Sequence, residues 1–307
     1  MKLHILKWER LWWSISAILI FGGIIAMVTS FFTFNSPIRP GLDFVGGTRL
    51  QLQLVCVAEG NCDQSIDTSK VREILVRQGL SGSVQVLEDN ILSIRSKNLN
   101  VDQRTQLQQN LNEKIGQFNP KTIQIDTVGP TVGQELFKSG ILALLAAFCG
   151  IIVYLTVRFQ FDYAFFAIIA LFHDILITTG IFALLGLIIK IEANSLFLVA
   201  LLTIIGFSVN DTVVIYDRIR DNIQRNPEVS ISEAIETSVN QSLARSINTS
   251  ITTILPLLAI FLFGGETLKY FSLALIIGFL AGAYSSIFIA STLLAWWRNR
   301  MFHSAES

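Results

Sequence analysis

The chain has 307 residues, of which 51% are hydrophobic and 15% are charged. Several apolar runs approach or exceed the roughly 20 residues that a helix needs to cross a bilayer, which predicts an integral membrane protein. The 23 basic and 23 acidic residues balance, so no net charge favours nucleic acid as a partner. Neither a Gly-x4-Gly-Lys-Ser/Thr phosphate loop nor a His-Glu-x-x-His motif occurs, and we expect no enzymatic activity, no cofactor and no metal site.

The first apolar run, Leu11 to Phe32, follows three basic residues and begins among tryptophans that suit a membrane interface. A signal peptide is the alternative interpretation. The run is long for such a peptide, and no small-x-small cleavage site follows it cleanly. We therefore expect residues 1–34 to form an N-terminal tail and a retained membrane helix.

Residues 35–137 are polar and predict a soluble α+β domain. Alternating and helical hydrophobic periods give the order βαββαβ, which is typical of a ferredoxin-like sandwich. The expected elements are a strand at Arg49 to Val57, a helix at Thr68 to Gln78, a hairpin of Ser83 to Leu87 and Ile91 to Arg95 turning at Glu88 to Asn90, a helix at Asp102 to Ile115 and a strand at Thr122 to Val128.

Residues 138–300 contain five further apolar segments, which makes six expected membrane helices in a polytopic α-helical protein. They are Gly140 to Val157, Tyr163 to Ile189, Ser195 to Tyr216, Ile247 to Phe263 and Leu268 to Trp297. Between the fourth and fifth, residues 227–243 predict an amphipathic helix at the cytoplasmic interface, and residues 301–307 form a tail.

Lysine and arginine are concentrated on one side of this arrangement, at both chain ends and in the loops after the second and fourth segments. The positive-inside rule then predicts cytoplasmic termini. The soluble domain between the first two helices lies on the opposite, external side.

Asp211 lies in a stretch, Gly206 to Asn222, that begins inside the fourth apolar segment and ends among charges. One continuous helix would carry Asn210 and Asp211 below the hydrocarbon surface, whereas Asp217 and Arg218 would emerge into water as a solvated helix end. An acidic residue at the centre of a membrane helix costs roughly 2.5–3.5 kcal/mol, so such residues usually face a bundle interior and mark an ion path. The position of Asp211 in this helix therefore indicates that the protein couples ion or proton movement to its function.

Two neighbouring segments also carry polar residues, with His173 and Asp174 in the third and Arg245 at the start of the fifth. Arg245 is the natural counter-charge, because it stays protonated while an adjacent aspartate can titrate. A motion that alternates a carboxylate between a desolvated and a paired environment would bind and release a proton. Alternatively, these groups only bond helix to helix, with Asp174 a structural partner of His173.

Two smaller features concern structure. Gly278 and Gly282 in the sixth segment predict close helix packing. Cys56 and Cys62 lie in the external region, where an oxidising compartment would allow a disulfide, but their spacing alone leaves the pairing open.

Several motifs together resemble the SecD/SecF protein-export family, a branch of the resistance-nodulation-division transporters. They cover nearly the whole chain in the expected order. They are Gly41-Leu42-Asp43-Phe44-Val45-Gly46-Gly47-Thr48, His173-Asp174, the fourth-segment stretch Gly206 to Arg220, and Arg245-Ser246-Ile247-Asn248-Thr249-Ser250.

The resemblance implies that the chain pairs with SecD in the bacterial inner membrane. The pair would use the proton gradient to help export an unfolded polypeptide that SecA threads through the SecYEG channel, with the soluble domain in the periplasm. The family's proton-path residues fall on Asp211 and Arg245. Ser246 stands where the family commonly has threonine, and Cys56 and Cys62 are not part of the family pattern.

Three functional hypotheses follow. The leading one is a proton-driven auxiliary subunit of the protein translocase. A half-size exporter of small molecules or lipids would need a substrate cavity in the external domain, which is small for that purpose. A purely structural adaptor would use its polar groups only to hold helices together.

Overall fold

The computed structural model describes residues 3–58, 66–87 and 90–305. It divides into two compact units, one of Met1–Arg39 with Gly140–Ser307 and one of Pro40–Ser139. Within the described residues, six helices are long and apolar enough to cross a membrane, which confirms the expected number. These spans are Leu6–Phe34, Pro130–Arg158, Phe161–Ile188, Ser195–Arg225, Ile231–Phe263 and Thr267–Met301.

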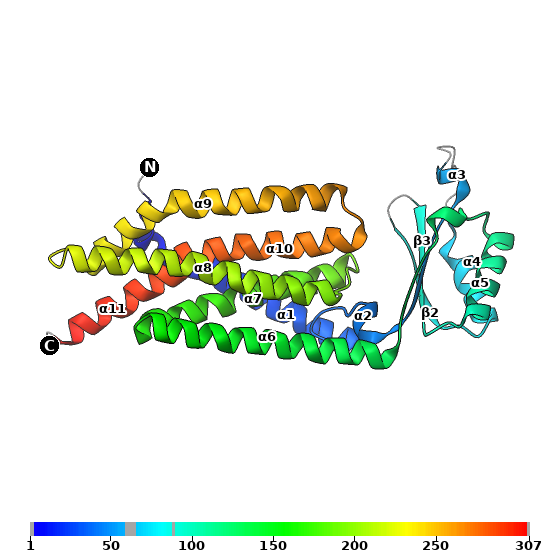
Figure 1. Ribbon diagram of the computed structural model, residues 1–307, viewed down its shortest axis with the longest axis horizontal. Coiled ribbons are helices and arrows are strands. Elements are labelled where there is room, and N and C mark those ends of the chain that lie inside the picture. Colours follow the sequence, from blue (N-terminus) through cyan, green and yellow to red (C-terminus); the bar gives the residue numbers. More distant parts are fainter. Residues whose placement is uncertain (1–2, 59–65, 88–89, 306–307) are drawn as a thin grey trace. The chain divides into compact units, whose positions relative to one another are not determined.

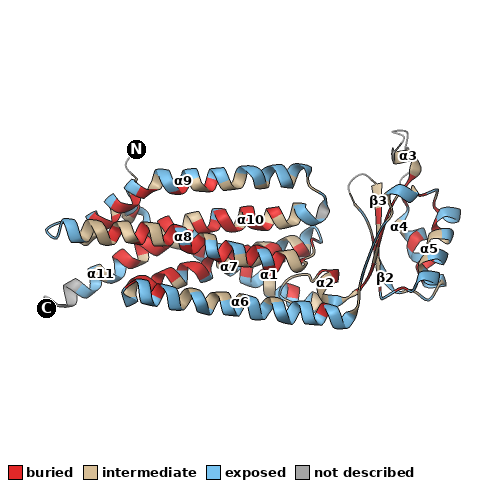
Figure 2. Cartoon of the chain, in the orientation of Figure 1, coloured by how far each residue is buried: buried red, intermediate tan, exposed pale blue. Residues whose placement is uncertain are grey.

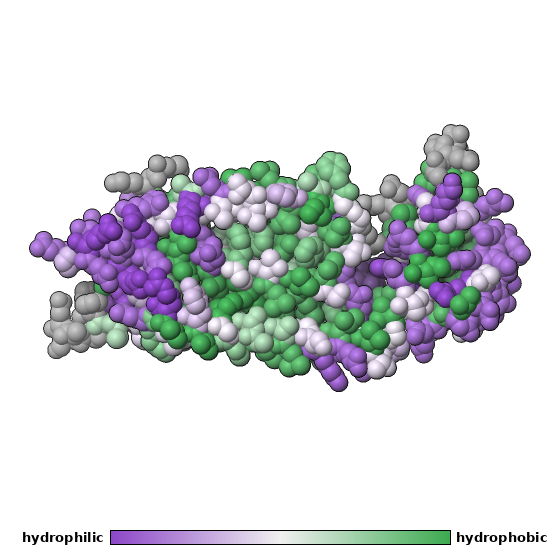
Figure 3. All heavy atoms as spheres, in the orientation of Figure 1, coloured by the Kyte–Doolittle hydropathy of each residue, from purple (hydrophilic) through white to green (hydrophobic). Residues whose placement is uncertain are grey.

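The helical unit is a bundle in which central helices are buried and peripheral helices are exposed (Figures 1 and 2). The central helices are α7 (Phe161–Ile188), α8 (Ser195–Arg225) and α10 (Glu266–Tyr284), and the peripheral ones are α1 (Glu9–Phe34), α6 (Pro130–Arg158) and α9 (Ile231–Phe263). Figure 3 shows hydrophobic side chains over the middle of this unit and hydrophilic ones around the turn between α8 and α9. This distribution fits a lipid-facing apolar belt with a polar, solvent-exposed end at the turn between α8 and α9.

Two helices differ from the expected boundaries. The amphipathic segment expected at residues 227–243 is not a separate helix, because α9 runs without a break from Ile231 to Phe263 and its first turns carry that segment. The sixth span is interrupted by a π-helix, η4 (Ser285–Ala290), which joins α10 to α11 (Ser291–Ala305). Short π-helical stretches inside α-helices are frequent at functional sites.

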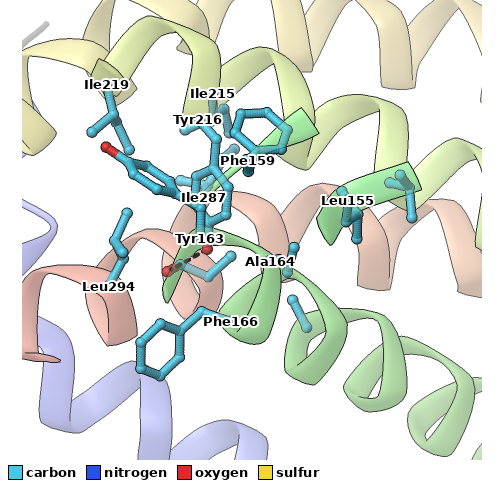
Figure 4. Close-up of a cluster of buried hydrophobic side chains, with 14 of the residues drawn as sticks. Leu155, Phe159, Tyr163, Ala164, Phe166, Ile215, Tyr216, Ile219, Ile287 and Leu294 are labelled. Atoms are coloured by element: carbon cyan, nitrogen blue, oxygen red, sulfur yellow. Dashed lines mark hydrogen bonds between the residues drawn. The ribbon is translucent and has the colours of Figure 1, made fainter. Parts of the chain in front are cut away.

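Aromatic rings pack together where the turn between α6 and α7 meets α8 (Figure 4). Tyr163 of α7 and Tyr216 of α8 meet edge to face at 5.1 Å between ring centroids, and Phe159 packs on both. The Tyr216 hydroxyl donates to the carbonyl of Ala290 at 3.1 Å. A π-helical backbone frees carbonyls that need such donors, so Tyr216 fastens η4 to α8.

Small residues let α10 approach α8 closely, as the glycine pair predicted. A Cβ atom on Gly282 would lie 3.1 Å from the Cβ of Ser208, and one on Gly278 would overlap Ile204. Close packing of this kind drives helix association where lipid removes the hydrophobic contribution. It also brings Ser208 and Ser285 into one layer of the bundle.

The smaller unit contains a four-stranded antiparallel sheet with the strand order β2-β3-β1-β4. The strands are β1 (Gly47–Gln53), β2 (Gly82–Val86), β3 (Ile91–Ser96) and β4 (Gln124–Val128), and two helices, α4 (Thr68–Arg77) and α5 (Val101–Lys114), cover one face. The predicted βαββαβ order and ferredoxin-like fold are confirmed. Leu50, Leu92 and Leu107 are among its fully buried residues.

The first strand is shorter than its alternating sequence predicts. Gln53 pairs with Ile91, the first residue of β3, and beyond this point Leu54 forms only an isolated bridge with Phe118. The chain instead turns into a short helix, α3 (Val55–Ala58). Two residues of the expected hairpin turn, Glu88 and Asp89, lie outside the described residues.

Candidate functional site

Asp211 lies inside the helical unit on α8 and is only 7% exposed. Ser246 of α9 donates its hydroxyl to Oδ1 of Asp211 at 2.8 Å. The other oxygen, Oδ2, is buried and has no hydrogen-bond partner among the described residues. A buried carboxylate oxygen without a donor carries a cost in free energy.

Arg245 precedes Ser246 on α9, but its side chain is exposed. The part of the chain that the structure describes holds no ion pair between Arg245 and Asp211, and the contact to Asp211 is made by the next residue, Ser246. Arg245 lines a hollow of about 490 Å³ together with Val214, Asp217, Arg218, Arg220, Asp221, Gln224, Gln241 and Ser242. The proposed counter-charge therefore faces a wet, polar hollow, and its pairing with Asp211 remains a prediction.

Asp174 of α7 is completely buried and well supplied with donors. Its Oδ1 lies 2.9 Å from Nδ1 of His173, and its Oδ2 accepts the hydroxyls of Ser208 and of Ser285, the latter at 2.8 Å. These donors come from α7, α8 and η4. Asp174 therefore ties three spans together.

His173 extends this network to the first span. Its Nε2 lies 2.9 Å from Oγ of Ser16, which donates to the Tyr284 hydroxyl at 3.3 Å, and Tyr284 donates to the carbonyl of Trp12 at 2.9 Å. The sequence analysis did not identify Ser16 or Tyr284. The available signal was weak, because Ser16 is one of three serines in the run Leu11 to Phe32.

The structure places the predicted polar residues in two separate settings. His173 and Asp174 form one buried network, and Asp211 with Ser246 forms another contact about one turn farther along α8 from Ser208. Asn210, next to Asp211, is exposed.

Asp217 and Arg218 lie near the polar, C-terminal end of α8. Asp217 pairs with Arg158 of α6 at 2.9 Å and with Arg220 at 3.2 Å. Arg218 donates to Gln241 of α9 at 2.6 Å. All are partly exposed, which supports their interpretation as a solvated helix end that links neighbouring helices.

The glycine-rich motif lies in the smaller unit, where it directs the chain into β1. Gly41 caps α2 (Leu42–Val45), and Asp43 lies in the first turn of that helix. Gly46 and Gly47 have φ of 74° and 124°, and a Cβ atom on Gly47 would lie 2.5 Å from the Ser96 carbonyl oxygen. The backbone therefore requires glycine at both positions.

The possible disulfide stays a prediction, because Cys62 lies outside the described residues. Cys149 is a free, exposed cysteine on α6. Among the residues that the structure describes, no group of three or more His, Cys, Asp or Glu side chains could hold a metal ion.

Comparisons with known proteins agree with the motifs. The family "Protein export membrane protein SecD/SecF, C-terminal" matches residues 107–300, and "SecD/SecF GG Motif" matches residues 31–56. The chain is 61% identical over 300 residues to Protein translocase subunit SecF of Synechocystis sp., covering 97% of this chain and 95% of that protein. It is 35% identical to Protein translocase subunit SecF of Prochlorococcus marinus, covering 92% and 91%.

A solved structure shares the fold. The crystal structure of SecDF, a translocon-associated membrane protein from Thermus thermophilus, superimposes with a TM-score of 0.81 at 28% identity. The match covers 98% of this chain but only 39% of the SecDF chain, so this chain spans well under half of that protein. Because the family match covers most of the chain and the relatives match it nearly end to end, the chain belongs to the SecD/SecF family of protein export membrane proteins.

Proposed function

We propose that this chain is a non-enzymatic auxiliary subunit of the Sec protein translocase. Together with SecD it would use the proton motive force to promote export of unfolded polypeptides through SecYEG, with SecA supplying the ATP-driven step. Its similarity to proteins named translocase subunits along its whole length supports this role over export of small molecules. The observation that carries the coupling is the buried, half-satisfied carboxylate of Asp211, whose single donor, Ser246, follows Arg245 in the chain.

The proposed cycle alternates the surroundings of Asp211. A proton that reaches Oδ2 would neutralise a buried carboxylate that has one donor, Ser246. Approach of Arg245 from its exposed position would favour the charged form and release the proton. A charge that crosses the membrane gains about 2.3 kcal/mol per 100 mV, which is comparable to the free-energy gap between two conformers.

SecD is the expected partner, because the structural relative is a SecDF chain of which this chain covers 39%. The outer helices α6 and α9 expose apolar side chains that a helical partner could cover, including Leu142, Val153, Ile247 and Ile251. By the positive-inside rule the termini and the α8–α9 turn face the cytoplasm. The smaller unit would then lie in the periplasm.

The test uses inverted inner-membrane vesicles that contain SecYEG, SecA, SecD and either this chain or its Asp211→Asn variant at matched levels. Completion of preprotein export is measured with and without a proton gradient. We expect Asp211→Asn to lose the gradient-dependent component and to keep the ATP-dependent one. Glu228→Gln, which removes an exposed carboxylate in the turn after α8, serves as the control and should keep both. Full gradient response in Asp211→Asn would overturn the proton-path assignment.

A further inference from the structure

The network around His173 carries a proton count that can be read from its donors and acceptors. A carbonyl can only accept, so the Tyr284 hydroxyl must donate its single proton to Trp12. In this structure Ser16 donates its own proton to the Tyr284 oxygen, at 3.3 Å. No hydroxyl proton is left between Ser16 and His173.

The 2.9 Å contact between Ser16 and Nε2 of His173 therefore needs a proton on Nε2. The 2.9 Å contact between Nδ1 of His173 and Oδ1 of Asp174 needs a second proton, carried by either atom. Oδ2 of Asp174 already accepts from Ser208 and Ser285. The pair thus holds two protons and is electrically neutral, either as imidazolium with carboxylate or as neutral imidazole with carboxylic acid.

We propose that the His173–Asp174 pair is a second proton-binding site, occupied in this conformation, and that Ser16 and Tyr284 transmit its occupancy to α1 and α10. This inference rests on the proposed proton-driven function and adds a site to it. Release of one proton takes the net charge of the pair from zero to minus one. The remaining proton stays on Nδ1, where it bonds the carboxylate.

Loss of that proton forces a rearrangement. Nε2 becomes an acceptor, and Ser16 must rotate its hydroxyl toward His173 to satisfy it. The Ser16 and Tyr284 hydroxyl oxygens then have no proton between them, so they no longer form a hydrogen bond. Of the two hydrogen bonds that link α1 to α10, the one from Ser16 to Tyr284 is therefore present only in the protonated state, whereas the one from Tyr284 to the Trp12 carbonyl is present in both.

The surroundings of the pair isolate this switch from other charges. Among the described residues, no lysine or arginine pairs with Asp174, and the titratable side chain in contact with His173 is Tyr284, which stacks at 6.1 Å between ring centroids. Ser208 comes three residues before Asp211 on α8, so α8 contacts both proposed proton sites. Occupancy of the pair can therefore bias the helix that carries Asp211.

The protonation state is tested by nitrogen-15 NMR. The chain has three histidines, so a His4→Gln, His303→Gln variant retains only His173. The full chain is labelled with 15N-histidine and studied in lipid nanodiscs at neutral pH. We expect Nε2 of His173 to carry a directly bonded proton. An unprotonated Nε2 with the proton on Nδ1 alone would overturn the inference, whatever Asp211 does.

The transmission step is tested with Tyr284→Phe in the vesicle export assay with SecD, against Tyr154→Phe, the same change at an exposed position of α6. Tyr284→Phe removes both the bond from Ser16 and the bond to Trp12. We expect it to reduce the gradient-dependent component by roughly fivefold or more, and Tyr154→Phe to leave that component unchanged. An unchanged component in Tyr284→Phe would overturn the transmission step. Full gradient response in Asp211→Asn would count against the Asp211 path alone, because the NMR result does not depend on it.

Discussion

Asp174 and Asp211 are both buried aspartates of membrane helices, but they differ in how many donors reach them. Asp174 has three hydrogen-bond partners, His173, Ser208 and Ser285, contributed by three spans. Asp211 receives one, from Ser246, and its second oxygen has none among the described residues. A buried network in which every polar group is hydrogen-bonded fixes the geometry of its helices. A carboxylate with one unbonded oxygen instead favours a conformation in which that oxygen gains a hydrogen bond.

The same contrast appears in the basic residue that accompanies each aspartate. His173 is locked between Asp174 and Ser16 inside the bundle, whereas Arg245 is exposed at the edge of a polar hollow. The network around His173 changes when one proton is lost and the Ser16 hydroxyl rotates. Pairing of Arg245 with Asp211 instead requires a side chain or a helix to move.

The largest expected effect is on stability, from Asp174→Ala. This change leaves His173, Ser208 and Ser285 without their acceptor, and breaking a buried pair by removing one partner costs about 3–5 kcal/mol. Denaturant-induced unfolding of the purified chain in detergent, followed by tryptophan fluorescence, measures the loss. A cost similar to that of an exposed substitution would remove the contrast between the two aspartates.

A smaller effect is expected from Ser246→Ala, which removes the single donor to Asp211. Loss of a hydrogen bond to a buried carboxylate within a membrane bundle should cost about 1–2 kcal/mol. Thr252→Ala is the control, because Thr252 is exposed on the same helix and bonds only to the backbone carbonyls of Asn248 and Thr249. Equal stability of the Ser246→Ala protein and the wild type would show that this contact is not formed in the membrane.

The smallest effect on stability is expected from Asp211→Asn. The amide keeps an acceptor for Ser246 and removes a poorly satisfied charge, so the unfolding free energy should stay within about 1 kcal/mol of the wild type. The same unfolding assay checks it. A loss as large as that of Asp174→Ala would mean that Asp211 is a structural group, and the export defect of the variant could then not be attributed to proton coupling.

Much of the fold could be predicted from local sequence. The six spans follow from apolar runs of sufficient length, and the βαββαβ order follows from two hydrophobic periods. The burial of Asp211 was also predictable, because a residue that far inside an apolar helix has few places to face except the bundle interior.

The errors arose where one element depends on another. The ladder between β1 and β3 ends where Gln53 meets Ile91, and Leu54 forms only an isolated bridge with Phe118, although the alternating pattern continues to Val57. The π-helix at Ser285–Ala290 is supported by donors from Tyr216 and from Ser291. A local pattern does not contain these partners.

The sequence by itself determined which segments enter the membrane, which side carries the positive charge, and which acidic residues lie within apolar helices, because these properties depend on length and composition. Only the tertiary structure decided that Ser16, His173 and Tyr284 share one network while Arg245 stays outside it. Residues 16, 173 and 284 lie on three different spans, and contacts between spans depend on how the bundle packs, including the close approach at Gly282. Asp174 and Asp211 differ in the number of hydrogen bonds to their carboxylates. This difference is therefore a property of the packed bundle rather than of either helix alone.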